Sequence, residues 1–218
     1  MDFEINGNPD FGDLTVRLKA GEAFWSQSGA MSRMSRDTQV TTRLVGGFLQ
    51  ALLRKALGGE SLFIAEYSSP AGGFVAFAPE ETGSILRRTL DGGTFNLTAG
   101  SFLACTPGLT LRTKFGGLRA FFSGEGAFFI ECAGTGELFF SAYGGVLEKQ
   151  IDGTLTVDTG HLVAWEPTLT YTIGGMGGLK QTLFSGEGLV MNFSGKGKIW
   201  LQTRNVKALA GWLSPLCR

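Results

Sequence analysis

Residues 117–126 read GLRAFFSGEG, and residues 178–188 read GLKQTLFSGEG. A second phrase recurs in the same way: residues 100–110 read GSFLACTPGLT, and residues 160–170 read GHLVAWEPTLT. Both phrases return after roughly 60 residues, with strand-like stretches inside each copy. Such a period indicates one supersecondary unit that has been copied and packed against its neighbours.

The composition supports a folded β-protein. The 218 residues include 34 glycines but only 6 prolines, and 43% are hydrophobic against 17% charged, which is too apolar for a disordered chain. Most of the sequence reads as short strands separated by glycines, so we predict an all-β fold. Asp91-Gly92 and Asp152-Gly153 fall at matching points of two copies and predict hairpin turns.

The repeats predict one β domain over residues 1–205 and a separate tail over residues 206–218. The copies are expected at about 58–113, about 116–173 and 177–204, where the third contains only the first half of the unit. Residues 14–21, LTVRLKAG, resemble residues 95–100, FNLTAG. We therefore expect strands within about 3–43 to complete the third copy and close the domain with pseudo-threefold symmetry, leaving no exposed sheet edge. A chance resemblance of short β segments is the alternative.

Two segments break the β pattern. Apolar residues between Leu44 and Leu57 recur at helical spacing, and Val206–Leu216 forms a second, shorter amphipathic segment. We expect these helices to cover a sheet or an open end of the β domain, with a subunit interface as the alternative. Binding to a membrane surface is the least favoured interpretation.

Charge and cysteine content restrict the partners and the compartment. Lys+Arg and Asp+Glu both number 19, so no overall field favours DNA, RNA or an anionic membrane. The three cysteines, Cys105, Cys132 and Cys217, are odd in number and widely spaced, as expected of reduced thiols. No secretory pattern opens the sequence, and no apolar run approaches the ~18 residues that span a bilayer. We therefore expect a cytoplasmic protein.

Residues suited to catalysis are scarce. His161 is the only histidine, and the sequence contains no Gly-x-Ser-x-Gly elbow. Cys105 matches Trp165 in the next copy, which predicts a buried apolar position rather than a reactive thiol. We therefore predict no enzyme, no catalytic residue, no metal and no cofactor. His161 is either a functional polar residue or a hydrogen-bonded turn residue.

Three glutamates occupy the same place in the three copies. They are Glu60, Glu125 and Glu187, each in a glycine-rich turn. If the copies form a ring, the carboxylates either point towards its axis or lie evenly around its rim. Carboxylates that converge on the axis would raise one another's pKa or require a cation. This is the hypothesis of a pseudo-threefold ligand or cation site. The alternative is a turn glutamate that accepts backbone N–H bonds in each copy.

Several phrases together resemble a known family. They are LGGESLF at 57–63, GSFLA at 100–104, DTGHLVA at 158–164, FSGEGL at 184–189 and GKGKIWLQTRN at 195–205. These phrases are similar to the altered-inheritance-of-mitochondria (mitochondrial biogenesis) family, in its bacterial form once classed as a domain of unknown function. The resemblance spans residues 3–205 and leaves out the tail.

The resemblance implies a fold like that of the tryptophan RNA-binding attenuation protein, a β-sandwich related to the double-stranded β-helix. It also implies a homo-oligomer, with a trimer favoured, and it supplies no catalytic residues. RNA wrapping transfers poorly, because the chain is neutral and has no evident repeated rim of lysine and phenylalanine. The leading function is therefore a structural or scaffolding homo-oligomer. The alternative is a small-ligand or RNA-binding module that uses the attenuator-like fold.

Overall fold

The structure, a computed structural model, describes residues 1–44, 63–115, 128–175 and 189–217. These residues form strands with one α-helix and short 3₁₀ turns, which confirms the predicted all-β class and the helix in the tail. The expected helix from Leu44 to Leu57 lies, beyond Leu44, outside the described residues.

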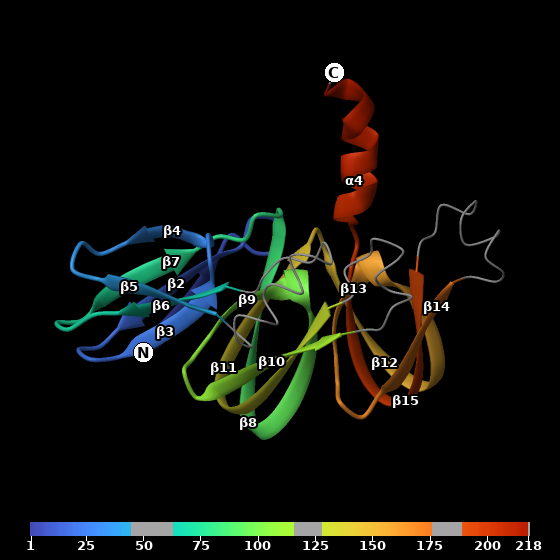
Figure 1. The fold of residues 1–218 in the computed structure, drawn as a ribbon, viewed down its shortest axis with the longest axis horizontal. Helices are drawn as coiled ribbons and strands as arrows, with labels where there is room; N and C mark the ends of the chain where they lie inside the picture. The colour runs from blue at the N-terminus through green and yellow to red at the C-terminus, as the bar shows by residue number, and fades with distance from the viewer. Residues whose placement is uncertain (45–62, 116–127, 176–188, 218) are drawn as a thin grey trace.

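Figure 1 shows the strands gathered in three lobes that lie in a row, with α4 (Val206–Leu213) projecting from them. The first lobe contains β1 (Asp2–Asn6), β2 (Asp13–Leu18), β3 (Ala23–Gln27), β4 (Met31–Met34), β5 (Gln39–Leu44), β6 (Phe63–Ser68) and β7 (Gly73–Phe77). The second contains β8 (Gly83–Thr98), η1 (Ala99–Ser101), β9 (Phe102–Cys105), β10 (Leu109–Phe115) and β11 (Phe128–Tyr143). The third contains β12 (Val146–Asp158), η2 (Thr159–His161), β13 (Leu162–Trp165), β14 (Thr170–Gly175) and β15 (Leu189–Gln202); η3 (Ser214–Leu216) follows α4.

The second and third lobes follow the same order of elements: a long strand, a 3₁₀ turn, a buried four-residue strand, a further strand and a second long strand. The two long strands of each lobe pair antiparallel over their whole length, β8 with β11 and β12 with β15. One sheet runs through the molecule in the order β12-β15-β13-β8-β11-β9-β3-β6-β5, and a smaller sheet has the order β1-β2-β7-β4. The ladders β3–β9 and β13–β8 join neighbouring lobes.

The N-terminal strands pair within their own lobe, apart from the β3–β9 ladder to the second lobe, and not with the end of the chain. β2 pairs with β1 and β7, whereas β15 pairs with β12, β13 and β14. The expectation that residues 3–43 complete the third copy is therefore wrong for the ladders among the described residues. The reason is that β2 already has buried partners, since Leu14 and Val16 share a core with Val75. The predicted copies 58–113 and 116–173 each begin in one lobe and end in the next.

The two predicted Asp-Gly hairpins are also wrong, because both dipeptides lie inside long strands. Asp91-Gly92 is part of β8 and Asp152-Gly153 is part of β12. Gly92 and Gly153 do have positive φ, at 74° and 123°. At the first site the register with β11 shifts between Ala133 and Thr135, which accommodates the extra residue as a bulge. At the second site the register with β15 runs on without a shift, so both strands continue past their glycine instead of reversing.

One of the buried clusters crosses both lobe boundaries. The cluster centred on the second lobe includes Ile64 of the first lobe and Trp200 of the third. Cys105 and Trp165 are at most 1% exposed, as their matched sequence positions predict. Burial raises the pKa of the Cys105 thiol well above its usual range, and burial raises that of Cys132 to about 12. Both thiols are therefore neutral and poorly nucleophilic at neutral pH.

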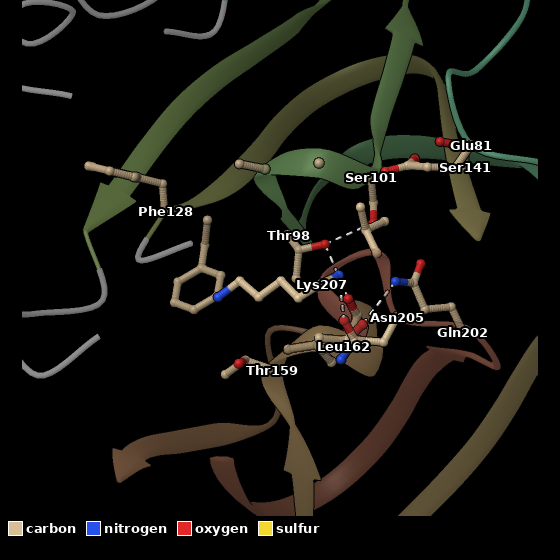
Figure 2. Close-up of a pocket in the computed structure, with 15 residues that line it drawn as sticks. Glu81, Thr98, Ser101, Phe128, Ser141, Thr159, Leu162, Gln202, Asn205 and Lys207 are labelled. Atoms are coloured by element: carbon tan, nitrogen blue, oxygen red, sulfur yellow. Dashed lines mark hydrogen bonds between the residues drawn. The ribbon is translucent and has the colours of Figure 1, made fainter. Parts of the chain in front are cut away.

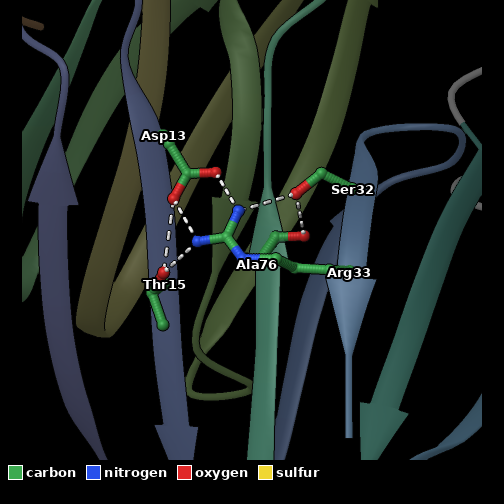
Figure 3. Close-up of polar contacts among 5 residues, drawn as sticks. All are labelled: Asp13, Thr15, Ser32, Arg33 and Ala76. Carbon is green, nitrogen blue, oxygen red and sulfur yellow. Dashed lines mark hydrogen bonds and ion pairs between the residues drawn. The ribbon is translucent and has the colours of Figure 1, made fainter.

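In the first lobe, Arg33 on β4 connects this strand to β2 in the smaller sheet (Figure 3). Its guanidinium donates to both carboxylate oxygens of Asp13 on β2, at 2.7 and 2.9 Å, and to the Thr15 hydroxyl at 3.1 Å. Because β7 lies between β2 and β4, this bidentate pair reaches across the middle strand.

Among the described residues, no helix has the length and apolar character needed to cross a membrane.

Candidate functional site

The proposed glutamate site falls on residues that the structure does not describe. Glu60, Glu125 and Glu187 all lie outside the described ranges, so their convergence stays a prediction. Elsewhere in the described part of the chain, no cluster of three or more His, Cys, Asp or Glu side chains is arranged to hold a metal ion.

His161 ends the turn η2 and is half-buried. Its Nδ1 lies 2.8 Å from the backbone oxygen of Gln202. Since a carbonyl oxygen can only accept, Nδ1 carries the hydrogen in this contact. The geometry is that of a hydrogen-bonded turn residue, the second of the two interpretations of His161.

A cavity of about 210 Å³ lies between the second and third lobes, at the base of α4 (Figure 2). Its walls come from the turns η1 and η2, from the ends of β8, β11 and β15, and from the first residues of α4. The lining residues are Glu81, Thr98, Ala99, Gly100, Ser101, Phe128, Phe129, Ser141, Thr159, Gly160, Leu162, Gln202, Asn205, Val206 and Lys207. The cavity therefore lies where the two equivalent turns of adjacent lobes meet.

Hydrogen bonds across the lobe boundary hold the inner wall of the cavity in place. The Thr98 hydroxyl is 2.8 Å from that of Ser101, and 3.2 and 3.3 Å from the backbone oxygens of Leu162 and Val163. Thr98 and Ser101 belong to the second lobe, whereas the two carbonyls belong to β13 of the third. These contacts keep η1 at a fixed distance from the third lobe.

Gln202 fixes the opposite wall. Its amide Nε2 donates to the backbone oxygen of Gly160 at 2.9 Å, and its Oε1 accepts from the backbone N–H of Tyr143 at 2.9 Å. Both halves of the carboxamide are thus used, one on each lobe.

Asn205 connects this wall to α4. Its Oδ1 accepts from the backbone N–H groups of Lys207 and Ala208, at 2.9 and 3.3 Å, and so caps the helix. The same side chain lies against Gly160: a Cβ built there would be 2.2 Å from Asn205 Nδ2. At the equivalent Gly100, a Cβ would meet nothing within 4 Å. Glycine is therefore sterically required at only one of the two matched positions.

The helix itself is solvent-exposed along its whole length. Its large apolar side chains are Val206, Leu209, Trp212 and Leu213, and Leu216 follows in η3. Trp212 and Leu216 are 67% and 68% exposed. The expectation that the tail covers a sheet or an open end is therefore wrong, and Figure 1 shows α4 standing away from the strands.

Two adjacent arginines of β8 contact the two neighbouring lobes. The Arg87 guanidinium lies 4.9 Å from the Phe3 ring of the first lobe and pairs with Glu137 at 2.8 Å. The Arg88 guanidinium lies 5.3 Å from the Trp200 ring of the third lobe. The hydrogen bond from Arg87 holds the pKa of Glu137 below its usual value. Because successive residues of a strand face opposite ways, Arg87 contacts the first lobe and Arg88 contacts the third.

The sequence contained signals for parts of this site. Asn205 directly precedes the apolar stretch of the tail, which is the position of an N-cap residue. In the sequence, Gly160 stands out only as part of a repeated phrase. Its steric role depends on Asn205, which lies 45 positions later in the chain. The cavity could not be read from the sequence, because its walls come from two lobes and the tail.

Comparison with known proteins supports a common family. Residues 3–204 match the family described as Mitochondrial biogenesis AIM24. An uncharacterised protein of Streptococcus pyogenes serotype M6 is 30% identical over 222 residues, covering 98% of this chain and 90% of that protein. A crystal structure of a Streptococcus pyogenes protein, from a structural genomics consortium, superposes with a TM-score of 0.84 at 30% identity, covering 99% of both chains. The chain therefore belongs to the Mitochondrial biogenesis AIM24 family.

Proposed function

We propose that this chain is a non-enzymatic structural protein that assembles with copies of itself through α4, with a trimer as the expected assembly. The observation that carries the proposal is the exposed apolar face of α4. An isolated helix of eight residues is marginal in water, so this helix gains most from a partner that covers its apolar face.

The spacing of the apolar residues favours another helix as that partner. Val206, Leu209, Leu213 and Leu216 are separated by three, four and three positions, which is the a/d spacing of helices that pack side by side. Trp212 flanks this stripe. Burying the exposed part of these five side chains is worth roughly 5 kcal/mol per helix, at about 1 kcal/mol each. That gain is comparable with the lower values for the cost of association.

The polar face of α4 argues against a membrane surface as the partner. A membrane-surface helix commonly carries several basic residues opposite its apolar side. Between Val206 and Leu216, Lys207 is the only charged residue, and the remaining residues outside the apolar stripe are Ala, Gly, Ser and Pro. A second copy of the same helix fits these properties better.

The proposal extends to the architecture and the compartment. The shared element order of the second and third lobes supports copies of one ancestral unit, of the β-sandwich or double-stranded β-helix kind. Pseudo-threefold closure finds no support in the ladders among the described residues. A cytoplasmic location is supported by the two buried, unpaired thiols, Cys105 and Cys132.

Native mass spectrometry of the full chain tests the proposal. We expect a trimer, and we expect Leu209→Glu to give a monomer because it places a charge in the apolar stripe. Gly211→Glu is the matched control: it adds the same charge on the other face, where a Cβ meets nothing within 4 Å. A monomeric wild type, or the same oligomeric state for Leu209→Glu and Gly211→Glu, would contradict the proposed contact.

RNA binding, the other hypothesis, stays a prediction with a simple test. A gel shift with mixed RNA at low salt that disappears as salt is added would support it.

A further inference from the structure

The cavity at the base of α4 has no role in the proposed assembly through this helix. It measures about 210 Å³, below the ~300–1,000 Å³ of pockets that take drug-sized ligands. A ligand of this size has about one ring.

The charged residues of the lining are balanced. Among the lining residues that the structure describes, Glu81 contributes a carboxylate and Lys207 an ammonium group, each with interactions of its own in the protein, and the others are uncharged. A ligand with net charge would be attracted by one of these groups and repelled by the other. The lining therefore favours an uncharged molecule.

Several lining groups can both donate and accept hydrogen bonds. Ser141 lines the cavity and is only 6% exposed, and its hydroxyl is not among the fully buried side-chain atoms of the described residues that lack a partner. This hydroxyl can both donate to and accept from a molecule in the cavity. Asn205 uses its Oδ1 for the helix cap, which leaves Nδ2 on the cavity side as a donor. Thr98 and Gln202 are fully engaged with the protein, so they hold the walls rigid.

The remaining wall is apolar. Phe128, Leu162 and Val206 line the cavity, with Ala99 beside them. A ring that presents C–H groups on one face and hydroxyls at its edge would match both walls at once. We infer that the cavity binds a small uncharged polyhydroxy molecule, of the size and chemistry of one sugar ring. This inference does not depend on assembly through α4.

Gly100 allows the cavity to be filled without disturbing its walls. A Cβ at Gly100 meets nothing within 4 Å, and Gly100 is not among the glycines with positive φ. Gly100→Leu therefore places a side chain in the cavity. Gly93→Leu is the matched control, because Gly93 has the same two properties but lies in β8 and does not line the cavity.

Saturation-transfer NMR with D-glucose and D-ribose, at millimolar concentration, tests the inference on the full chain. Benzoate, which carries one negative charge at neutral pH, serves as a charged probe of similar size. We expect sugar signals with the wild type and with Gly93→Leu, and their loss with Gly100→Leu. Ser141→Ala should weaken sugar binding about 5-fold, as for one lost hydrogen bond.

Three results would overturn the inference. They are the absence of any sugar signal with the wild type, sugar signals that persist unchanged in Gly100→Leu, and displacement of the sugars by a charged probe that binds more tightly. Circular dichroism of each variant separates loss of the site from loss of the fold. If Gly100→Leu does not fold, the affinity of Ser141→Ala for the sugars decides the question. An unchanged affinity would count against the site, and an affinity about 5-fold lower would support it.

Discussion

Gly160→Ala should release the cap of α4 while leaving the β lobes intact. The new Cβ would lie 2.2 Å from Nδ2 and 2.8 Å from Cγ of Asn205, so the Asn205 side chain must move. Its Oδ1 then no longer accepts from the N–H groups of Lys207 and Ala208. Loss of an N-cap costs about 0.5–2 kcal/mol, and about 1 kcal/mol corresponds to a roughly 5-fold increase in local opening.

Amide hydrogen exchange over residues 206–213 measures this effect directly. Protection of these amides should fall about 5-fold in Gly160→Ala and stay unchanged in Gly100→Ala, the matched position where the Cβ meets nothing within 4 Å. Asn205→Ala should have the same effect as Gly160→Ala. The double variant should lose no more than either single variant, because both remove the same cap. Unchanged protection in Gly160→Ala, or additive losses in the double variant, would refute the steric reasoning.

Three further predictions follow from the burial and the charge pairs. Of the three thiols, only the exposed Cys217 should react with an aromatic disulfide reagent in the native protein, because burial raises the pKa of both Cys105 and Cys132; denaturant should release all three. Glu137 has a lowered folded pKa, so its stabilising effect is present above the ordinary value of 4.5 and is lost as pH falls through the folded pKa. Between pH 7 and about pH 3, the urea midpoint of unfolding should therefore fall less in Glu137→Gln than in the wild type. An equal fall in both proteins would show that the pair with Arg87 does not contribute to stability. Arg88→Leu should lower the free energy of unfolding in urea by about 1–2 kcal/mol, because the Arg88 guanidinium contacts Trp200 and pairs with Glu166. Arg17→Leu is the control: its side chain is 65% exposed, so the loss should be less than about 0.5 kcal/mol.

The sequence predicted the class of the fold and several of its strands, because apolar alternation and glycine punctuation are local properties. It also predicted the burial of Cys105 from its match with Trp165. The Asp-Gly dipeptides misled the prediction of turns, because a glycine with positive φ suits a bulge as well as a hairpin. Only the opposing strand decides between the two, and β11 lies about 40 residues away in the sequence from Asp91.

The connection of the lobes could not be predicted from the repeated phrases. Phrases in matching positions identify equivalent residues but not the partner of each strand. Residues 14–21 and residues 95–100 resemble each other because both lie just before a short strand of their own lobe, β3 and β9, so the resemblance does not indicate a missing half of the third copy. The exposure of α4 was equally hidden, since an amphipathic pattern predicts that one side is covered but not by what.

Crosslinking through Cys217 tests most directly whether α4 joins copies of the chain. This residue lies at the end of the helical tail and is the only exposed cysteine among the three. With a short bismaleimide, the wild type should give a covalent dimer on a denaturing gel, and Cys217→Ser and Leu209→Glu should give none. A chain that forms a trimer in solution but yields no Cys217-linked dimer would contradict assembly through α4.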